Sequence, residues 1–316
     1  MPEPKDETYH TRDYRPGDET AIAALFGTVF GQPLTENQWR WKYTGTGIRP
    51  PLARLAFDHT GRLVGHAGAI SLRGWRQGQP LPFLQICDVM VHPDARGQLG
   101  QRNLFTVLAR ELLSSLAERW PEALAYGFPG RRPFRLGEYA RVYGRVEQVS
   151  ALYRPSWRGL FSWLYTRPLA WNDPRLDSLW ARLVPGFALA LVRDRDYLRW
   201  RYATHPCRVY QLLGIYLAGR LLGWAVVQRD DHHLRIIDLL VSQRWLKPAL
   251  AALEHTAAVA GASEVEIWLP PGWRETLDGQ QKLTEVVVAN MIWRLPIPTT
   301  EVREALYYTM GDLDIF

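Results

Sequence analysis

Residues 87–104 read CDVMVHPDARGQLGQRNL. The apolar, branched residues before His92 predict the end of a strand, and the apolar spacing further on predicts a helix that begins near Gly100. Between the two lies a basic loop, to which Arg96 and Arg102 contribute full positive charges. A loop that enters a helix presents unpaired backbone N–H groups, and the helix dipole adds positive potential. The segment therefore predicts a cradle for an anion such as a pyrophosphate.

The expected secondary structure extends from this segment in both directions. Apolar runs rich in branched residues predict strands at 63–70, 83–91 and 123–128. Leucines at helical spacing predict a helix over 102–119 with one apolar face. The leucines of that face are Leu104, Leu108, Leu112, Leu113 and Leu116. Strands and helices in this order indicate a mixed α/β sheet covered by helices.

Two short blocks of the first half recur in the second half. WRWKY at 39–43 recurs as LRWRY at 198–202, and GRLVGHA at 61–67 recurs as GRLLGWA at 219–225. The two pairs are separated by 159 and 158 positions, so the spacing is kept as well as the sequence. The second half then repeats the predicted order, with two strands, a helix and a strand at 221–227, 234–241, 248–259 and 265–269. This repetition predicts two copies of one supersecondary plan.

The composition is that of a globular protein with room for two cores. The chain has 316 residues, of which 47% are hydrophobic and 22% charged. Cys87 and Cys207 are its only cysteines, so we expect no disulfide framework, no metal site and a reducing cytoplasm. The polar N-terminus has no signal-peptide core, and no apolar run reaches the ~20 residues of a membrane span. The net charge of +6 predicts an anionic partner: a phosphorylated cofactor, an acidic carrier protein, RNA or a lipid surface.

Residues 87–104 resemble the acyl-CoA signature of the GNAT superfamily of acyltransferases, which reads Arg/Gln-x-x-Gly-x-Gly/Ala after a strand that ends Val-x-Pro. Arg96 matches the first position, whereas Leu99 and Gln101 stand where small residues belong. Residues 126–139 resemble the later strand and helix of the same superfamily. A glycine-containing turn before a helix is often only a tight turn, but these further matches and the repeat favour the GNAT interpretation.

The resemblance implies an α/β (α+β) fold of two tandem GNAT folds, each a mixed, mostly antiparallel sheet flanked by helices. An N-terminal GNAT domain over 8–150 would bind acyl-CoA, and a connecting helical segment over 151–190 would lead to a degenerate GNAT-like domain over 191–316. The second copy has no glycine in the loop at 242–248 and would shape the acceptor pocket. The residues expected to bind acetyl-CoA or another acyl-CoA are Met90, Val91, Arg96, Gly97, Gln98, Leu99, Gly100, Gln101 and Arg102.

Aminolysis of a thioester needs a neutral amine, an oxyanion stabiliser and an acid for the leaving thiol. Histone-modifying GNAT enzymes carry a basic Glu at the position of Gln85, which cannot serve. Asp88 is the nearest carboxylate and a candidate base, the alternative being a buried Asp bonded to backbone. Tyr139 and Tyr143 are candidate acids, or else core residues. The carboxylate of Phe316 is a further candidate, because N-myristoyltransferase and the Eis-like acetyltransferases use the chain terminus as base.

The favoured function is N-acyl transfer, with acetyl as the favoured group, from acyl-CoA to a primary amine on a small molecule, peptide or lipid. One alternative is a long-chain acyltransferase that takes its acyl group from acyl-CoA or an acyl-carrier protein and acts on a lipid or peptide amine. Another is a non-catalytic module that binds acyl-CoA. The Fem-type relatives, which use aminoacyl-tRNA, rank lower because no coiled-coil arm is visible. DNA is not an expected partner.

The segment 153–167 mixes arginines with large aromatic rings. If it were helical, Trp157, Leu160, Phe161 and Leu164 would share one face. Such a face usually packs into a core. The alternative is peripheral contact with a membrane or an acyl chain, because Trp and Tyr favour the membrane–water boundary and Arg attracts anionic head groups.

The anion cradle gives the first testable prediction. Replacing Arg96 and Arg102 together by Glu reverses two charges beside the loop glycines, and we expect the affinity for acyl-CoA to fall strongly. Calorimetric titration with acetyl-CoA measures this affinity directly. An unchanged dissociation constant would refute the assignment of this loop to the donor phosphates.

Overall fold

The computed structural model describes residues 9–96, 103–157, 163–230 and 232–313. The chain forms two compact units, and both are discontinuous in sequence. The first unit comprises Met1–Leu72, Pro82–Val146 and Val288–Thr299, and the second comprises Arg73–Leu81, Glu147–Val287 and Thr300–Phe316. No helix in the described parts of the chain is long and apolar enough to cross a bilayer.

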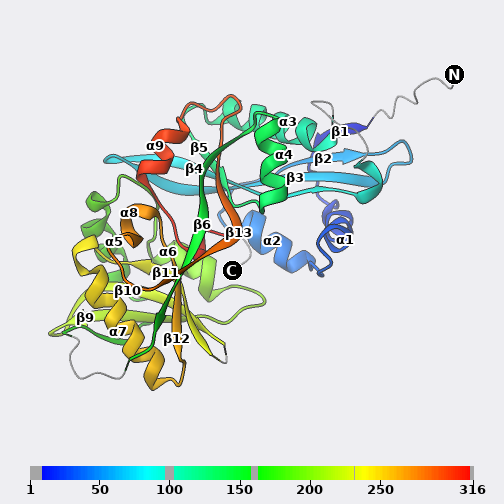
Figure 1. The fold of residues 1–316 in the computed structure, drawn as a ribbon. Helices are drawn as coiled ribbons and strands as arrows, with labels where there is room; N and C mark the ends of the chain where they lie inside the picture. Colours follow the sequence, from blue (N-terminus) through cyan, green and yellow to red (C-terminus); the bar gives the residue numbers. More distant parts are fainter. Residues whose placement is uncertain (1–8, 97–102, 158–162, 231, 314–316) are drawn as a thin grey trace. The chain divides into compact units, whose positions relative to one another are not determined.

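The first unit is a mixed sheet with helices, drawn mostly in blue to green in Figure 1. Its strand order is β1-β2-β3-β4-β5-β13. The strands are β1 (His10–Asp13), β2 (Leu52–Phe57), β3 (Leu63–Arg76), β4 (Gln79–Val91), β5 (Leu124–Gly127) and β13 (Gln280–Met291). The helices are α1 (Glu19–Phe30), α2 (Glu36–Thr44), α3 (Leu104–Arg119) and α4 (Arg131–Tyr139), with a short 3₁₀ turn η1 (Pro93–Ala95) after β4. Pairs β1/β2, β2/β3 and β5/β13 are antiparallel, whereas β4 and β5 are parallel.

The second unit repeats this plan with strands and helices of its own. Its strand order is β6-β12-β11-β10-β9-β7, and the short pair β8 and β14 joins the part of β3 that belongs to this unit. The strands are β6 (Tyr143–Pro155), β7 (Tyr165–Pro168), β8 (Leu189–Leu191), β9 (Gln211–Leu217), β10 (Arg220–Arg229), β11 (His233–Leu240), β12 (Glu264–Trp268) and β14 (Leu306–Tyr307). The helices are α5 (Arg175–Leu183), α6 (Arg195–Leu198), α7 (Leu246–Val259), α8 (Pro271–Arg274) and α9 (Thr299–Ala305). Short turns are η2 (Val184–Gly186), η3 (Arg199–Ala203), η4 (Gln243–Trp245) and η5 (Met310–Asp312).

Local sequence explains where the main helices begin. Thr35 caps α2 by accepting from the Gln38 backbone N–H, and the Gln38 side chain accepts from the Thr35 N–H, which completes a capping box. Asn103 caps α3 by accepting from the Thr106 N–H at 2.8 Å. All five leucines of the predicted apolar face of α3 are buried. The fold class inferred from the sequence, a mixed α/β sheet flanked by helices, is confirmed.

The repeated blocks take the same local structure in the two units. Gly61 and Gly219 both adopt φ of 82°, the left-handed region that a tight turn requires here. The following strand carries one extra residue in each unit, Val64 in the β2/β3 pair and Leu222 in the β9/β10 pair. Because these features fall 158 positions apart, the repeat seen in the sequence corresponds to a repeat in backbone geometry.

A buried tyrosine–aspartate hydrogen bond also recurs. Tyr43 donates to Asp88 Oδ2 at 2.7 Å in the first unit, and Tyr202 donates to Asp238 Oδ2 at 2.8 Å in the second. Each tyrosine comes from the first repeated block, and each aspartate lies near the end of the strand that follows the second block. The two units therefore fix corresponding strands by the same contact.

The division of the chain differs from the contiguous boundaries expected from sequence. Strand β13, which the sequence reasoning did not anticipate, carries Val288–Thr299 back into the first unit, where Ala289 pairs with Gly127. Residues 151–190 contain strand β7, which pairs with β9, as well as helix α5. Pairing with strands distant in sequence produces both differences, because such pairing leaves no mark in local periodicity.

The side chains expected on one helical face of this segment do not share one environment. Trp157 is 58% exposed, whereas Leu164 is buried. Leu160 and Phe161 lie outside the described residues. The residues on either side, in β6 and β7, are extended, so the expected continuous helical stripe is not the conformation of the described part.

The contact between α2 and β3 gives a stability prediction. A Cβ atom added at Gly68 would lie 2.3 Å from the Tyr43 hydroxyl oxygen, so Gly68→Ala must displace the ring that bonds Asp88. We expect a loss of about 1–3 kcal/mol in the free energy of unfolding, measured by urea denaturation. Gly272→Ala is the matched control, because nothing lies within 4 Å of its added Cβ. Equal stability of the two variants would contradict the packing described.

Candidate active site

The candidate site lies at the C-terminal end of β4. This strand pairs with β5 in parallel register from Phe83↔Leu124 to Ile86↔Gly127. Strand β5 ends at Gly127, whereas β4 continues to Val91. The last residues of β4 therefore extend past the end of their parallel neighbour, at the edge of the first unit's sheet where α3 follows in the chain.

Backbone directions at this end can be assigned from the hydrogen bonds. The His92 N–H donates to the Val64 carbonyl of β3 at 2.8 Å. Successive residues of a strand point their backbone groups to opposite sides, so the N–H and C=O of Val91 face away from β3. The Val91 carbonyl accepts from Arg96 Nε at 2.8 Å. The Val91 N–H thus points to the side on which β5 has ended, with the Arg96 guanidinium beside it.

Asp88 produces an irregularity in β4 just before this end. Its φ is 49°, in the left-handed region that costs energy for a residue with a side chain. Its carboxylate accepts two bonds from Lys42 Nζ, at 2.8 and 2.9 Å, and one from the Tyr43 hydroxyl. The side chains of Asp88 and Lys42 are only 6% and 10% exposed. A buried, fully bonded ion pair therefore holds the unfavourable backbone conformation in place.

The electrostatics of this cluster bear on its chemical role. Burial would raise the pKa of the Asp88 carboxyl, but the charge of Lys42 and the bonds from Lys42 and Tyr43 hold it below its usual value. His66 contacts the Asp88 carbonyl oxygen through Nδ1 at 2.7 Å, and burial lowers the pKa of His66. The imidazole is therefore neutral with its proton on Nδ1. A carboxylate with a low pKa and occupied oxygens suits the positioning of β4 better than the acceptance of a proton.

The two tyrosines proposed as acids lie in different surroundings. Tyr139, on α4, is 70% exposed. Tyr143 is buried, with ring centroids 5.9 Å from Phe105 and 6.3 Å from Phe134. Burial raises the pKa of Tyr143 well above its usual value. Tyr143 therefore acts as a core residue between α3 and α4 in this structure.

Several predicted site residues fall outside the described part of the chain. These are Gly97, Gln98, Leu99, Gly100, Gln101, Arg102 and Phe316. Of the predicted donor-binding residues, Met90, Val91 and Arg96 are described, and the structure places them together at the end of β4. The assignment of Phe316 as a base and that of the loop at 97–102 as the phosphate cradle stay predictions.

The second unit contains a related but differently completed cluster. Arg193 donates to both Asp238 and Asp312, and all three side chains are at most 2% exposed. Burial and the nearby Asp238 raise the pKa of Asp312 to about 6, although Arg193 opposes the shift. The Thr309 hydroxyl donates to Asp238 at 2.9 Å. The described part of the C-terminal tail is therefore built into the core of this unit.

The sequence reasoning did not assign roles to Lys42, Tyr43 or Arg193. Lys42 and Tyr43 lie inside the repeated block at 39–43, and the recurrence of a basic residue followed by Tyr was the available signal. Arg193 carried no such signal, because its partner Asp238 lies 45 positions later in the chain.

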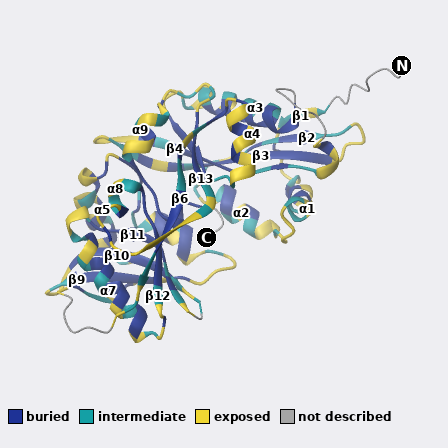
Figure 2. Ribbon diagram, in the orientation of Figure 1, coloured by how far each residue is buried: buried dark blue, intermediate teal, exposed yellow. Residues whose placement is uncertain are grey.

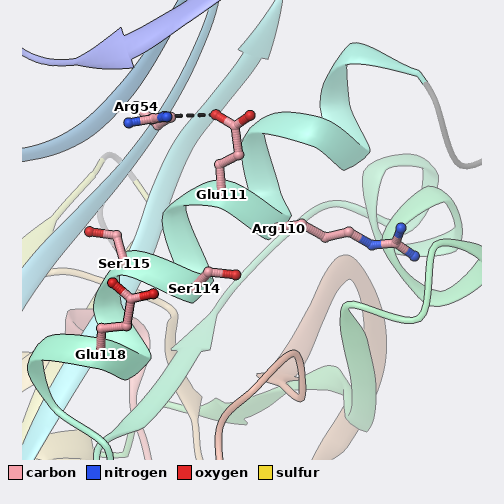
Figure 3. A pocket seen from close by; sticks show the side chains of 6 residues that line it. All are labelled: Arg54, Arg110, Glu111, Ser114, Ser115 and Glu118. Carbon is pink, nitrogen blue, oxygen red and sulfur yellow. Dashed lines mark hydrogen bonds and ion pairs between the residues drawn. The ribbon is translucent and has the colours of Figure 1, made fainter.

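A surface pocket of about 390 Å³ lies elsewhere on the first unit, along the later turns of α3 (Figure 3). Its lining residues are Arg54, Arg110, Glu111, Ser114, Ser115 and Glu118. Arg54 Nε donates to Glu111 at 2.7 Å, while Arg110 points away from the others, with its guanidinium 4.4 Å above the Trp293 ring. Because Arg54 and Glu111 are paired with each other and the pocket lies along the later turns of α3, away from the end of β4, we do not assign the chemistry to this pocket.

Comparisons with known proteins find a match over the part of the chain that contains this site. Residues 10–144 match the family model described as acetyltransferase (GNAT) domain. This segment contains the whole Lys42–Asp88 cluster, the end of β4 and α3. The N-terminal part of the chain is thus similar to the GNAT domain of acetyltransferases. A comparison with curated protein sequences gave no match.

Solved structures show the same fold. A GCN5-related N-acetyltransferase from Anabaena variabilis is 15% identical, with a TM-score of 0.68, and the match covers 91% of this chain and 73% of that one. One from Kribbella flavida is 16% identical, also at 0.68, with 91% and 72% covered. Saccharomyces cerevisiae N-myristoyltransferase, solved with bound myristoyl-CoA, is 11% identical at 0.59, with 89% and 81% covered. The likeness extends through both halves of this chain.

The Lys42–Asp88 pair gives a prediction with a defined pH dependence. Lys42→Met leaves a buried carboxylate without its cation, so we expect a loss of about 3–5 kcal/mol in unfolding free energy at pH 7. The wild-type pair stabilises the fold above the unfolded carboxyl pKa of about 3.9, and this contribution disappears as pH falls through the lower folded value. The difference between the two proteins should therefore shrink below about pH 4.

Urea denaturation at pH 7 and at about pH 3, below the unfolded carboxyl pKa of about 3.9, measures this difference. Lys247→Met is the control, since Lys247 is exposed on α7 and its loss should change stability by no more than about 0.5 kcal/mol. A Lys42→Met penalty that is the same at both pH values would show that packing, not the ion pair, is what the lysine supplies.

Proposed function

We propose that the protein is an N-acyltransferase that moves an acyl group, with acetyl favoured, from acyl-CoA to a primary amine. The observation that carries the proposal is the coincidence of two features in residues 10–144. The segment matches the GNAT domain, and its β4 ends with the Val91 N–H directed past the end of β5. An oriented backbone donor at such a strand end is what a thioester carbonyl requires in order to be polarised.

The described residues fit the acyl end of the donor. The Val91 N–H would donate to the thioester oxygen, where negative charge develops as the amine attacks. Arg96, held at the Val91 carbonyl, adds positive charge on the side from which α3 begins. The helix start and the basic residues of the adjoining loop would bind the donor phosphates. Each of these groups acts by position and charge, with no covalent intermediate on the protein.

Asp88, Lys42 and Tyr43 are proposed as positioning residues. Their contacts fix the left-handed turn of β4 and thereby the direction of Val91 three residues later. A neutral acceptor amine attacks the thioester carbon, the C–S bond breaks, and a proton passes from the amine to the leaving thiolate. Tyr139 is exposed and remains a candidate for that acid, and the Phe316 carboxylate remains a candidate base.

We further infer that the chain holds two tandem GNAT copies, of which only the first binds a donor. The matched glycine turns, strand irregularities and Tyr–Asp bonds of the two units support the tandem arrangement. In the second unit the chain itself contacts the residue after Asp238, since the Tyr307 hydroxyl donates to the Leu239 carbonyl at 2.6 Å.

The backbone donor can be tested by removing one N–H. Val91→Pro lacks it, and a proline is tolerated where the N–H makes no ladder bond. We expect kcat to fall by about 10²–10³ with little change in affinity for acetyl-CoA. Val91→Ala keeps the N–H and should retain near wild-type kcat, which separates the backbone effect from the side chain.

The assay follows acyl transfer from acetyl-CoA and from myristoyl-CoA to a panel of primary amines. If Val91→Pro kept the wild-type kcat, the Val91 N–H would not be the oxyanion donor. Turnover with myristoyl-CoA alone would replace acetyl transfer by the long-chain alternative. Binding of acyl-CoA without turnover of any amine would favour a non-catalytic module.

A further inference from the structure

Helix α4 presents a basic face that also carries two exposed apolar residues. Arg131, Arg135 and Tyr139 recur every four residues and so form one line along the helix, and Leu136 lies beside it. Tyr139 is 70% and Leu136 38% exposed, and the arginines are exposed as well (Figure 2). The opposite side of the helix is buried through Phe134 and Gly137. The exposed face is therefore a fixed surface on a packed helix.

The charge of this region is concentrated. Residues 131–145 contain five arginines and one glutamate, a net charge of +4, compared with +6 for the whole chain. The arginines are Arg131, Arg132, Arg135, Arg141 and Arg145, and all are exposed. Arg145 lies 4.6 Å above the Phe134 ring and 3.7 Å from Glu138, which fixes its position at the border of the helix. A patch of one sign attracts a partner of the opposite sign over about a Debye length.

The basic face is coupled to the donor end of the first unit. The Tyr143 ring contacts Phe105 in the first turn of α3 on one side and Phe134 of α4 on the other. The Arg110 guanidinium of α3 donates to the Ala140 carbonyl, just after α4, at 2.9 Å. A partner bound to α4 would therefore contact a helix that packs, through Tyr143, against the start of α3, and the start of α3 faces the donor.

The chemistry of the face favours an acidic protein over a lipid surface. An interfacial helix needs a broad apolar face to insert among acyl chains. On α4 only Leu136 and Tyr139 are exposed large apolar residues, and arginines flank both. A protein interface, in contrast, commonly combines Tyr and Arg with a complementary charged rim.

The signature sequence points in the same direction. Leu99 and Gln101 replace the small residues that allow a pyrophosphate to approach the backbone closely in the GNAT superfamily. A donor attached to a carrier protein through phosphopantetheine has one phosphate in place of the CoA pyrophosphate and lacks the adenosine. This loop then has fewer phosphate groups to bind, and the docking of the carrier protein supplies the remaining affinity.

We propose that α4 and the adjoining arginines are the docking surface for an acidic acyl-carrier protein that delivers the acyl group on phosphopantetheine. This inference rests on the proposed N-acyl transfer and names its donor. The acyl carbon leaves the phosphopantetheine sulfur and bonds to the amine nitrogen, and the amine proton goes to the released thiol. Carrier docking on α4 places that thioester at the end of β4.

The test compares three donors on three proteins. Acetyl-acyl-carrier protein, acetyl-CoA and carrier-free acetyl-phosphopantetheine are used with wild type, Arg131→Glu/Arg135→Glu and Arg208→Glu/Arg220→Glu. The last variant changes the net charge by the same amount at exposed arginines of the second unit. We expect the α4 variant to bind the carrier at least about tenfold more weakly, with unchanged KM and kcat for the two small donors. The control variant should behave as wild type with all three.

The experiment also measures carrier binding at two salt concentrations and the binding of lipid vesicles. Carrier binding by the wild type should weaken between low and physiological salt, and this dependence should decrease in the α4 variant. Equal carrier affinity of all three proteins, or no carrier binding by the wild type, overturns the docking proposal. Binding of anionic phosphatidylglycerol vesicles that is lost in the α4 variant, while carrier affinity is unaffected, would assign the face to a membrane. Absence of product from every donor would refute the proposed acyl transfer itself, whereas turnover of acetyl-CoA without carrier binding would refute only the docking surface.

Discussion

The geometry of the first unit depends on the ion pair between Lys42 and Asp88. Asp88 adopts a positive φ that a residue with a side chain avoids, and its carboxylate is buried. Both costs are offset by the Lys42 ammonium and the Tyr43 hydroxyl, which reach β4 from helix α2. The constraint reaches Val91, because the turn at Asp88 sets which backbone groups of the following residues face β3. A helix near the start of the chain thus orients the strand end at which the proposed chemistry occurs.

The second unit completes the repeated tyrosine–aspartate contact with different groups. Tyr202 and Asp238 repeat the contact of Tyr43 and Asp88, but a buried arginine, Arg193, replaces the lysine and also binds Asp312 of the C-terminal tail. The tail therefore packs against the strand that carries Asp238. This difference explains physically why two related copies need not both bind a donor, since the second stabilises itself with groups that a ligand would otherwise contact.

Much of the fold could be predicted from the sequence, but less of the candidate site could. Helical and strand periodicity located α3, α7 and the strands from β3 to β5 and from β10 to β12, because these segments bury one face. Strand β13 was missed, since its place beside β5 depends on pairing between residues about 160 positions apart. The signature identified Val91 and Arg96, yet no local pattern revealed that Asp88 is bonded by Lys42, 46 positions earlier. Position alone made Asp88 a candidate base, whereas the bonds from Lys42 and Tyr43 to its carboxylate support the proposal that it is a positioning residue.

The central claim is that the Val91 N–H donates a hydrogen bond to the thioester oxygen of the donor. Amide NMR of the ¹⁵N-labelled protein, with Val91 assigned by comparison with Val91→Ala, tests it directly when acetyl-CoA is added without an acceptor amine. The account predicts a large downfield shift of the Val91 amide proton, absent when CoA lacking the acetyl group is added, because only the thioester supplies the carbonyl oxygen. A Val91 amide that stays unchanged at saturating acetyl-CoA, while amides elsewhere in the chain respond, would contradict it.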